Sequence, residues 1–195
     1  MRAAFALLGL GFLCIAIFGY YTLGKPHPDG LKKPHVSMPM LTLTSSAFKE
    51  GGGIPSLYTC DGKNVNPPLS LSGIPAGTQS FVLIVENPDI PQVVKDSMHS
   101  TMFDHFVLFN IPSSTKELPE NLSGIGVVGN NTRGPGYTGP CPPAEYEPRE
   151  HRYIFSLAAL DTTLDLPPGS TKEAVQKASA GHILETAVLI GRYKR

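Results

Sequence analysis

The sequence predicts an all-β-dominated fold: an antiparallel β-sandwich with one or two peripheral helices, preceded by an N-terminal transmembrane helix. Three observations lead to this class. Several short runs rich in β-branched and aromatic residues are bounded by proline or glycine, as strands are. The 20 glycines and 19 prolines among 195 residues favour a turn-rich β protein over a helical one. Only one segment of the domain has a convincing helical pattern.

The first 23 residues form a separate unit. Residues 3–23 carry no charge, and a stretch of this length can span a bilayer as a helix. We predict a membrane anchor, with a cleaved signal peptide as the alternative, because the best small-x-small cleavage site, at residues 14–16, is a poor match. Residues 24–39 are rich in Pro, His, Lys and Gly without periodicity, which predicts a linker. Residues 40–195 are the expected folded domain.

This organisation also predicts a localisation. We expect a single-pass membrane protein whose domain is periplasmic or otherwise extracytoplasmic, or a secreted protein if the first segment is cleaved. The orientation stays open, because three lysines after the span outweigh Arg2 on the positive-inside rule.

Five apolar runs are predicted as strands of the domain. Residues 81–85 form a continuous run between Gly77 and Pro88, which indicates a central strand buried on both faces. Residues 41–45 alternate in the manner of a strand. The other three runs occupy residues 106–111, 153–160 and 187–193.

One helix is predicted in the domain, between Thr171 and Thr186. Ser170 and Glu173 fit a capping box that follows a proline and glycine cluster. Several strands with proline-rich connections and one late helix are typical of an antiparallel sandwich. The 16 basic and 16 acidic residues balance, so the chain lacks the overall positive charge that nucleic-acid binding needs, and nucleic acid is not an expected partner.

Polar side chains lie beside three of the predicted strands. Asp89 follows the first and His105 precedes the second, while His151 precedes the third and Tyr153 begins it. If these strands pair, their ends bring the four side chains into one small pocket. Histidine donates hydrogen bonds and becomes cationic near neutral pH, so both histidines could hold a phosphate oxygen. Each residue also has a structural alternative: a hydrogen-bonded histidine, a core tyrosine, or an aspartate that only shapes its turn.

The motifs at these positions belong to a series that spans the domain from Thr42 to Lys194. In order they are Tyr58-Thr59-Cys60-Asp61-Gly62, Asn66-Pro67-Pro68-Leu69-Ser70, Pro88-Asp89, His105-Phe106, Asn110-Ile111-Pro112, Gly139-Pro140-Cys141-Pro142-Pro143 and His151-Arg152-Tyr153. Each motif is weak alone, but together, in this order and at these spacings, they resemble the phosphatidylethanolamine-binding protein family, in its bacterial Raf kinase inhibitor-like (YbhB/YbcL) branch.

The resemblance implies a β-sandwich of this family's type with a small anion pocket that accepts phosphate or a phospholipid head group. His105, His151 and Tyr153 are then expected to bind the ligand. Asp89 is expected to orient a neighbour, because its negative charge would repel an anion. The complete set of expected ligand-site residues is Asn87, Asp89, His105, Gly139, Pro142, His151 and Tyr153.

The chain departs from the family pattern in two ways. Asn87 stands where the family typically has an aspartate, so a charge that would raise the pKa of a neighbouring histidine is missing. We therefore expect a less cationic pocket and weaker phosphate binding. Tryptophans common in the bacterial branch are absent, with Leu71 and Phe103 at two equivalent positions, so the shape of the pocket is expected to differ.

Cys60 and Cys141 lie in two of these motifs. In an oxidising compartment they could form a disulfide, whereas in the cytosol both would remain thiols. A zinc site made from Asp89, His105, His151 and Cys141 is the other interpretation, but no Cys-x-x-Cys or His-x-x-x-His spacing supports it. We therefore expect no metal and no cofactor.

Three classes of function remain. The favoured one is a non-catalytic module that binds a phosphate-bearing or phospholipid ligand. The second is an inhibitor or regulator of a kinase or protease, which would act through surface loops such as residues 92–102. A hydrolase is least favoured, because nucleophile signatures such as G-x-S-x-G are absent from the sequence.

Overall fold

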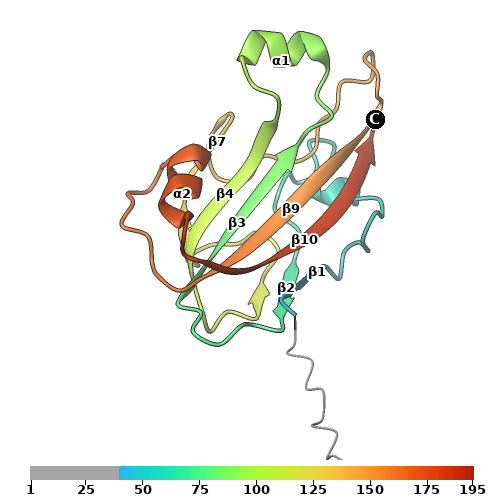
Figure 1. Cartoon of the computed structure of the whole chain (residues 1–195). Coiled ribbons are helices and arrows are strands. Elements are labelled where there is room, and N and C mark those ends of the chain that lie inside the picture. The colour runs from blue at the N-terminus through green and yellow to red at the C-terminus, as the bar shows by residue number, and fades with distance from the viewer. Residues whose placement is uncertain (1–39) are drawn as a thin grey trace, which may run out of the picture. The chain divides into compact units, whose positions relative to one another are not determined.

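A five-stranded antiparallel sheet is the framework of the domain in the computed structural model, which describes residues 40–195 (Figure 1). The strand order is β10, β9, β3, β4, β6, and each pairing is antiparallel. The bounds are Ser80–Asn87 for β3, Phe103–Pro112 for β4, Val127–Val128 for β6, Glu150–Leu160 for β9 and Ile183–Lys194 for β10. The run predicted as a central strand is thus the middle strand of the sheet.

Strand β3 is buried on both faces, as its continuous apolar sequence requires. Phe81, Leu83 and Val85 belong to one hydrophobic cluster, and Val82 and Ile84 belong to a second cluster on the opposite face. This alternation follows from the two-residue period of a strand.

The first cluster lies between this sheet and a smaller one. The smaller sheet has the order β1 (Thr42–Thr44), β2 (Leu69–Ser72), β5 (Glu117–Leu118). Leu43, Leu71 and Leu118 from its strands belong to the same cluster as the core residues of β3. The two sheets therefore form the predicted antiparallel sandwich. Strands β7 (Asn130–Asn131) and β8 (Gly134–Pro135) form a separate two-stranded hairpin.

Helix α2 (Lys172–Ser179) covers the second cluster, to which it contributes the fully buried Val175. The predicted helix is confirmed here, but its limits were wrong. Thr171, rather than Ser170, caps the helix by accepting the N–H of Ala174. The helix ends at Ser179 instead of Thr186, because the following residues leave in a left-handed turn at Gly181 (φ 84°) and pair with β9.

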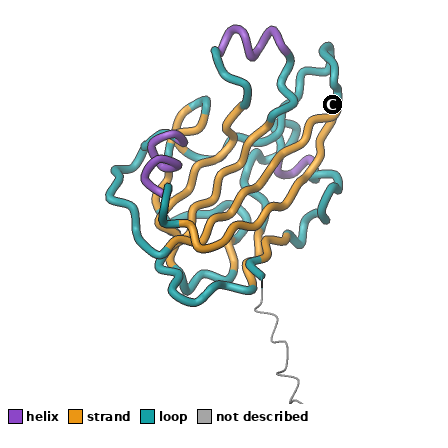
Figure 2. Tube along the Cα trace, in the orientation of Figure 1, coloured by secondary structure: helices purple, strands orange, loops and turns teal. Residues whose placement is uncertain are grey.

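Helix α1 (Gln92–Met98) connects β3 and β4 at one end of the sheet (Figure 1). Its segment was expected to be a surface loop, and none of its residues is buried. A single 3-10 turn, η1, spans Ser56–Tyr58. Figure 2 shows that the helices lie at the periphery of the strands, which confirms a β-rich domain with two peripheral α-helices.

The prediction of a transmembrane helix, and of a membrane-anchored periplasmic domain that depended on it, is corrected. Within residues 40–195 no helix is long and apolar enough to cross a membrane. Helices α1 and α2 have 7 and 8 residues, whereas about 20 are needed to span the hydrocarbon core. The segments predicted as anchor and linker, residues 1–23 and 24–39, lie outside the described residues.

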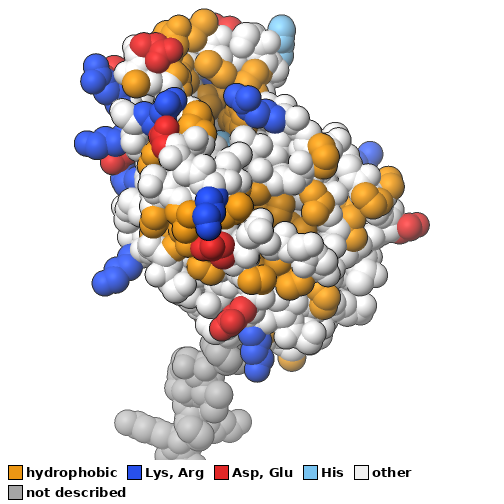
Figure 3. All heavy atoms as spheres, turned by 180° about the vertical axis from the view of Figure 1, so that it is seen from behind, with side chains coloured by type: hydrophobic (Ala, Val, Ile, Leu, Met, Phe, Trp, Pro, Cys, Tyr) orange, Lys and Arg blue, Asp and Glu red, His pale blue; other side chains and the backbone are white. Residues whose placement is uncertain are grey.

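Charged side chains of both signs are mixed over the face in Figure 3, with no single large patch of one sign. Hydrophobic side chains gather on this face below the end of the molecule that carries α1. The pocket described next lies at this end of the sheet.

Candidate functional site

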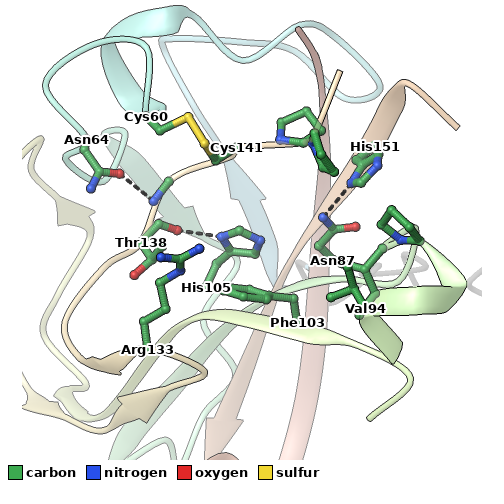
Figure 4. Close-up of a pocket in the computed structure, with 15 residues that line it drawn as sticks. Cys60, Asn64, Asn87, Val94, Phe103, His105, Arg133, Thr138, Cys141 and His151 are labelled. Carbon is green, nitrogen blue, oxygen red and sulfur yellow. Dashed lines mark hydrogen bonds between the residues drawn. A yellow bond between two sulfur atoms is a disulfide. The ribbon is translucent and has the colours of Figure 1, made fainter. Parts of the chain in front are cut away.

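A pocket of about 420 Å³ lies where β3, β4 and β9 end beside α1 (Figure 4). The loop of residues 138–143 forms its opposite wall, while Val94 of α1 and the preceding Ile90 and Pro91 give it an apolar side. Known small-molecule pockets have volumes of roughly 300–1,000 Å³. The space is therefore sufficient for a phosphate group together with a small organic substituent.

The pairing of β3 with β9 and the alternation of β9 explain why His151 reaches this pocket. His151, Tyr153 and Phe155 alternate along β9 and are all buried, with exposed fractions of 1% each. Phe155 and Tyr153 belong to the sandwich core, and His151 is the next residue on that face toward the end of the strand. The core face of β9 thus ends in the imidazole of His151, which lines the pocket.

A β-bulge directs His105 toward the same pocket. Val85 pairs with Phe106 but Glu86 pairs with Asp104, so β4 carries one extra residue, His105, at this point. A bulge changes the direction of the side chain at the extra residue. His105 consequently lies with Tyr153 (ring centroids 5.0 Å apart) and Phe103 (4.7 Å), while Asp104 bonds Lys172 of α2.

Residues 131–138 hold the bulge in place. The N–H of Thr138 and the side-chain amide of Asn131 both donate to the His105 carbonyl oxygen, at 2.8 and 3.2 Å. In return the carbonyl of Thr138 accepts a hydrogen bond from His105 Nδ1 at 2.6 Å (Figure 4). The main chain and the imidazole ring of His105 are therefore both held by residues 131–138.

Asn87 holds His151. Its amide nitrogen lies 2.9 Å from His151 Nδ1 (Figure 4). Its amide oxygen accepts the N–H of Asp89 at 2.9 Å. Asn87 therefore orients the His151 ring, whereas Asp89, which was expected to orient a neighbour, bonds Arg152.

Asp89 itself is directed away from the pocket. Its carboxylate accepts three hydrogen bonds from Arg152: one from the main-chain N–H at 2.9 Å and two from the guanidinium at 2.8 and 2.6 Å. The side-chain hydrogen bond from Arg152 lowers the pKa of Asp89. This aspartate does not line the pocket. Its hydrogen bonds join the segment that follows β3 to Arg152 of β9.

Burial determines the charge of both histidines. Desolvation lowers the pKa of His105 to about 4, and the Thr138 carbonyl opposes this shift only partly. Burial also lowers the pKa of His151, while the Pro148 carbonyl and the Asp89 carboxylate act in the opposite direction. Both rings are therefore neutral at pH 7.

Three buried polar atoms have no hydrogen-bond partner within the described part of the chain: His105 Nε2, His151 Nε2 and Tyr153 Oη. Buried polar atoms almost always have a partner, so three such atoms near one another require an explanation. The two imidazoles line the pocket, whereas Tyr153 packs behind His105 and does not line it. Burial raises the pKa of Tyr153, so its hydroxyl is neutral.

A disulfide between Cys60 and Cys141 joins the loop of residues 138–143 to the segment after η1 (Figure 4). Gly139 and Pro142 both line the pocket, as their motif suggested. The N–H of Gly139 donates to Asn64 Oδ1 at 2.7 Å, and a Cβ at this glycine would overlap the Tyr58 carbonyl oxygen. This wall therefore requires glycine.

The zinc site considered in the sequence analysis would have no thiolate ligand, because the sulfur of Cys141 is in the disulfide. Asp89 is likewise occupied by Arg152. In residues 40–195 no group of three His, Cys, Asp or Glu side chains is arranged to hold a metal ion.

Arg133, Phe103, Asn64 and Thr138 line the pocket but were not predicted as ligand residues. The Arg133 guanidinium lies 5.9 Å from the centre of the Phe103 ring, and it forms no ion pair with a carboxylate of the described residues. No Asp or Glu of residues 40–195 lines the pocket. Among the described residues, the only permanently charged side chain of the pocket is thus a cation.

Comparisons with known proteins agree with this fold. A family model described as "Phosphatidylethanolamine-binding protein" matches residues 44–194. A UPF0098 protein of Methanothermobacter thermautotrophicus is 46% identical over 162 residues, which cover 80% of this chain and 99% of the relative. A UPF0098 protein of Aquifex aeolicus is 40% identical over 163 residues, covering 80% of this chain and 90% of the relative.

Two solved structures are also similar. One is CT736 of Chlamydia trachomatis, described as a putative phosphatidylethanolamine-binding protein homologue, with a TM-score of 0.75, 40% identity and coverage of 80% of this chain and 99% of that one. The other is E. coli YbcL, described as a member of the mammalian PEBP family, with a TM-score of 0.69, 27% identity and coverage of 80% and 98%. The predicted family is confirmed: this chain belongs to the phosphatidylethanolamine-binding protein family and carries a small ligand-binding or regulatory domain.

Proposed function

We propose that the domain is a non-catalytic binding module that recognises a phosphate-bearing ligand, free or as a phospholipid head group, in the pocket described above. The observation that carries this proposal is the pair of imidazole Nε2 atoms of His105 and His151, both buried and both without a partner in residues 40–195. A ligand with several oxygen atoms would supply the missing partners.

The charge of the pocket supports an anion. Arg133 provides a guanidinium at the rim, no carboxylate of residues 40–195 lines the wall, and Asp89 is neutralised by Arg152. Both imidazoles are neutral at pH 7, so hydrogen bonds rather than ion pairs would contribute most of the specificity. We therefore expect modest affinity, in agreement with the loss of the family aspartate at position 87.

The available side chains favour binding over hydrolysis. Both cysteines that line the pocket are joined in the disulfide, so neither offers a thiolate. Thr138 is the only hydroxyl residue on the described wall, and its Oγ1 accepts a hydrogen bond from Asn131 while His105 bonds its carbonyl. A nucleophile activated by a neighbouring base is the usual requirement for covalent hydrolysis.

Calorimetric titration of the whole chain with inorganic phosphate and phosphoethanolamine tests the proposal. Saturable binding is expected, together with its loss in the His105→Ala, His151→Ala double variant. His182→Ala is the matched control, because His182 is an exposed histidine that bonds Asp161 away from the pocket. Thermal unfolding of each variant verifies that it is folded. Absence of binding by the parent chain would overturn the proposal and turn attention to a kinase or protease partner.

A further inference from the structure

The two unpartnered imidazole nitrogens in the pocket have opposite hydrogen-bonding character. His105 Nδ1 lies 2.6 Å from the carbonyl oxygen of Thr138, which can only accept. Nδ1 must therefore carry the proton of the neutral ring, and Nε2 presents a lone pair. His105 is 4% exposed, and this lone pair has no donor in the described chain.

The hydrogen bonds of Asn87 give His151 the other tautomer. Because the N–H of Asp89 donates to the Asn87 amide oxygen, the amide nitrogen must be the atom that faces His151 Nδ1, 2.9 Å away. An amide nitrogen only donates, so Nδ1 of His151 accepts and the ring proton is on Nε2. His151 thus presents an N–H at a site where His105 presents a lone pair.

We propose that the pocket selects the protonated form of a phosphate monoester or of inorganic phosphate, and discriminates against phosphodiesters and sulfate. This inference rests on the proposed function and narrows it to free phosphate and phosphate monoesters, so the diester head group of an intact phospholipid is no longer an expected ligand. A P–OH group would donate to His105 Nε2, and a neighbouring P–O⁻ oxygen would accept from His151 Nε2–H. A phosphodiester and a sulfate ion have acceptor oxygens only, so their oxygens would face the lone pair of His105.

Protonation of His105 is the alternative way to bind such ligands, and its surroundings oppose it. Around this ring lie the aromatic rings of Phe103 and Tyr153, the His151 imidazole and the Arg133 guanidinium. Arg133 and His151 both lower the pKa of His105, which burial already brings to about 4. The carboxylates of Asp89 and Asp104 are bonded to Arg152 and Lys172 respectively.

Asn87 also opposes a charged His151, as burial does, whereas the Pro148 carbonyl and the Asp89 carboxylate favour it. A protonated Nδ1 would point its hydrogen at the NH₂ of Asn87, and turning the amide would leave the N–H of Asp89 without an acceptor. The asparagine that replaces the expected aspartate therefore maintains the donor and acceptor arrangement of the pocket. An aspartate at this position would accept the proton of Nδ1 and favour the imidazolium.

The test is titration of the full chain at pH 7 with four probes: inorganic phosphate, methyl phosphate, dimethyl phosphate and sulfate. We expect phosphate and methyl phosphate to bind, and dimethyl phosphate and sulfate to bind about tenfold or more weakly, since a site built for a donor rejects analogues that lack it. Above the second pKa of a phosphate monoester, about 6, methyl phosphate should bind with uptake of close to one proton. Calorimetry in buffers of different ionisation enthalpy measures this uptake.

The variant His105→Gln tests independently whether the lone pair of His105 causes the selectivity, because a glutamine amide can present either a donor or an acceptor. This variant is expected to gain sulfate binding, and its affinities for sulfate and phosphate should differ by no more than about threefold. Misfolding cannot produce such a gain. His182→Ala should retain the selectivity of the parent.

The outcomes separate this inference from the proposed function. Equal affinity of the parent for sulfate and phosphate would overturn the selectivity but leave an anion site. Preference for dimethyl phosphate over methyl phosphate would likewise refute selection of a protonated monoester and point to an intact phospholipid head group. If none of the four probes binds, both proposals fail.

Discussion

Lowering the pH from 7 to 4 should destabilise this domain, because His105 is held neutral when folded. The pKa of a histidine changes from its ordinary value of 6.5 to about 4 on burial at this position. Below pH 6.5 the unfolded chain therefore binds a proton that the folded chain does not. The contribution of neutral His105 is complete above pH 6.5, falls as the pH decreases toward 4, and changes no further below it.

The size of the effect follows from the difference in pKa. At 1.36 kcal/mol per pKa unit, a change from 6.5 to about 4 corresponds to about 3 kcal/mol of unfolding free energy. For a domain of this size, 1 kcal/mol shifts Tm by roughly 2–4 °C, so His105 should account for a decrease of roughly 6–12 °C.

Thermal unfolding of the parent and of His105→Gln between pH 4 and 7 measures this contribution. Other groups titrate in the same range, including His151, whose pKa is also lowered, so the relevant quantity is the difference between the two pH profiles. The variant should lose about 3 kcal/mol less than the parent over this interval. Parallel profiles would refute the argument, because they would mean that His105 has the same proton affinity in both states.

Three further predictions follow from the pocket and its wall. Asn87→Asp should raise the pKa of His151, seen as a higher midpoint in histidine NMR titration, and tighten phosphate binding; an unchanged midpoint and affinity would contradict the role of this residue. Gly139→Ala should destabilise the domain by about 1–3 kcal/mol in urea unfolding, because its Cβ would overlap the Tyr58 carbonyl, whereas Gly53→Ala, with open space around its Cβ, is the control and should have little effect. Reduction of the disulfide, which closes a loop with a sequence separation of 81, should lower the unfolding free energy by about 4 kcal/mol, and equal stability with and without reductant would argue against it.

Much of the scaffold could be predicted from residue patterns. The continuous apolar run of β3 indicates burial on both faces, and the alternation of β9 places His151 and Tyr153 on the face that carries Phe155. These predictions work because periodicity reports local geometry directly. The limits of α2 were less accessible, because the residues after Ser179 are held by long-range pairing of β10 with β9.

The side-chain arrangement of the pocket depends on features that local patterns do not encode. The direction of His105 comes from a bulge that is visible only in the register between β3 and β4. The sequence-based hypothesis assigned Asp89 an orienting role but did not identify its partner, because Arg152 reaches Asp89 from β9. Arg133 was missed because it comes from the hairpin of β7 and β8, a segment without any distinctive motif.

The most direct test of the central claim is a histidine-selective NMR titration of the full chain with inorganic phosphate. The spectrum reports the ring nitrogens of each histidine separately, so His99 and His182, which do not line the pocket, serve as internal controls. The account predicts saturable shifts of the His105 and His151 Nε2 signals with the control rings unchanged. Unchanged signals from both pocket histidines at saturating phosphate would contradict it.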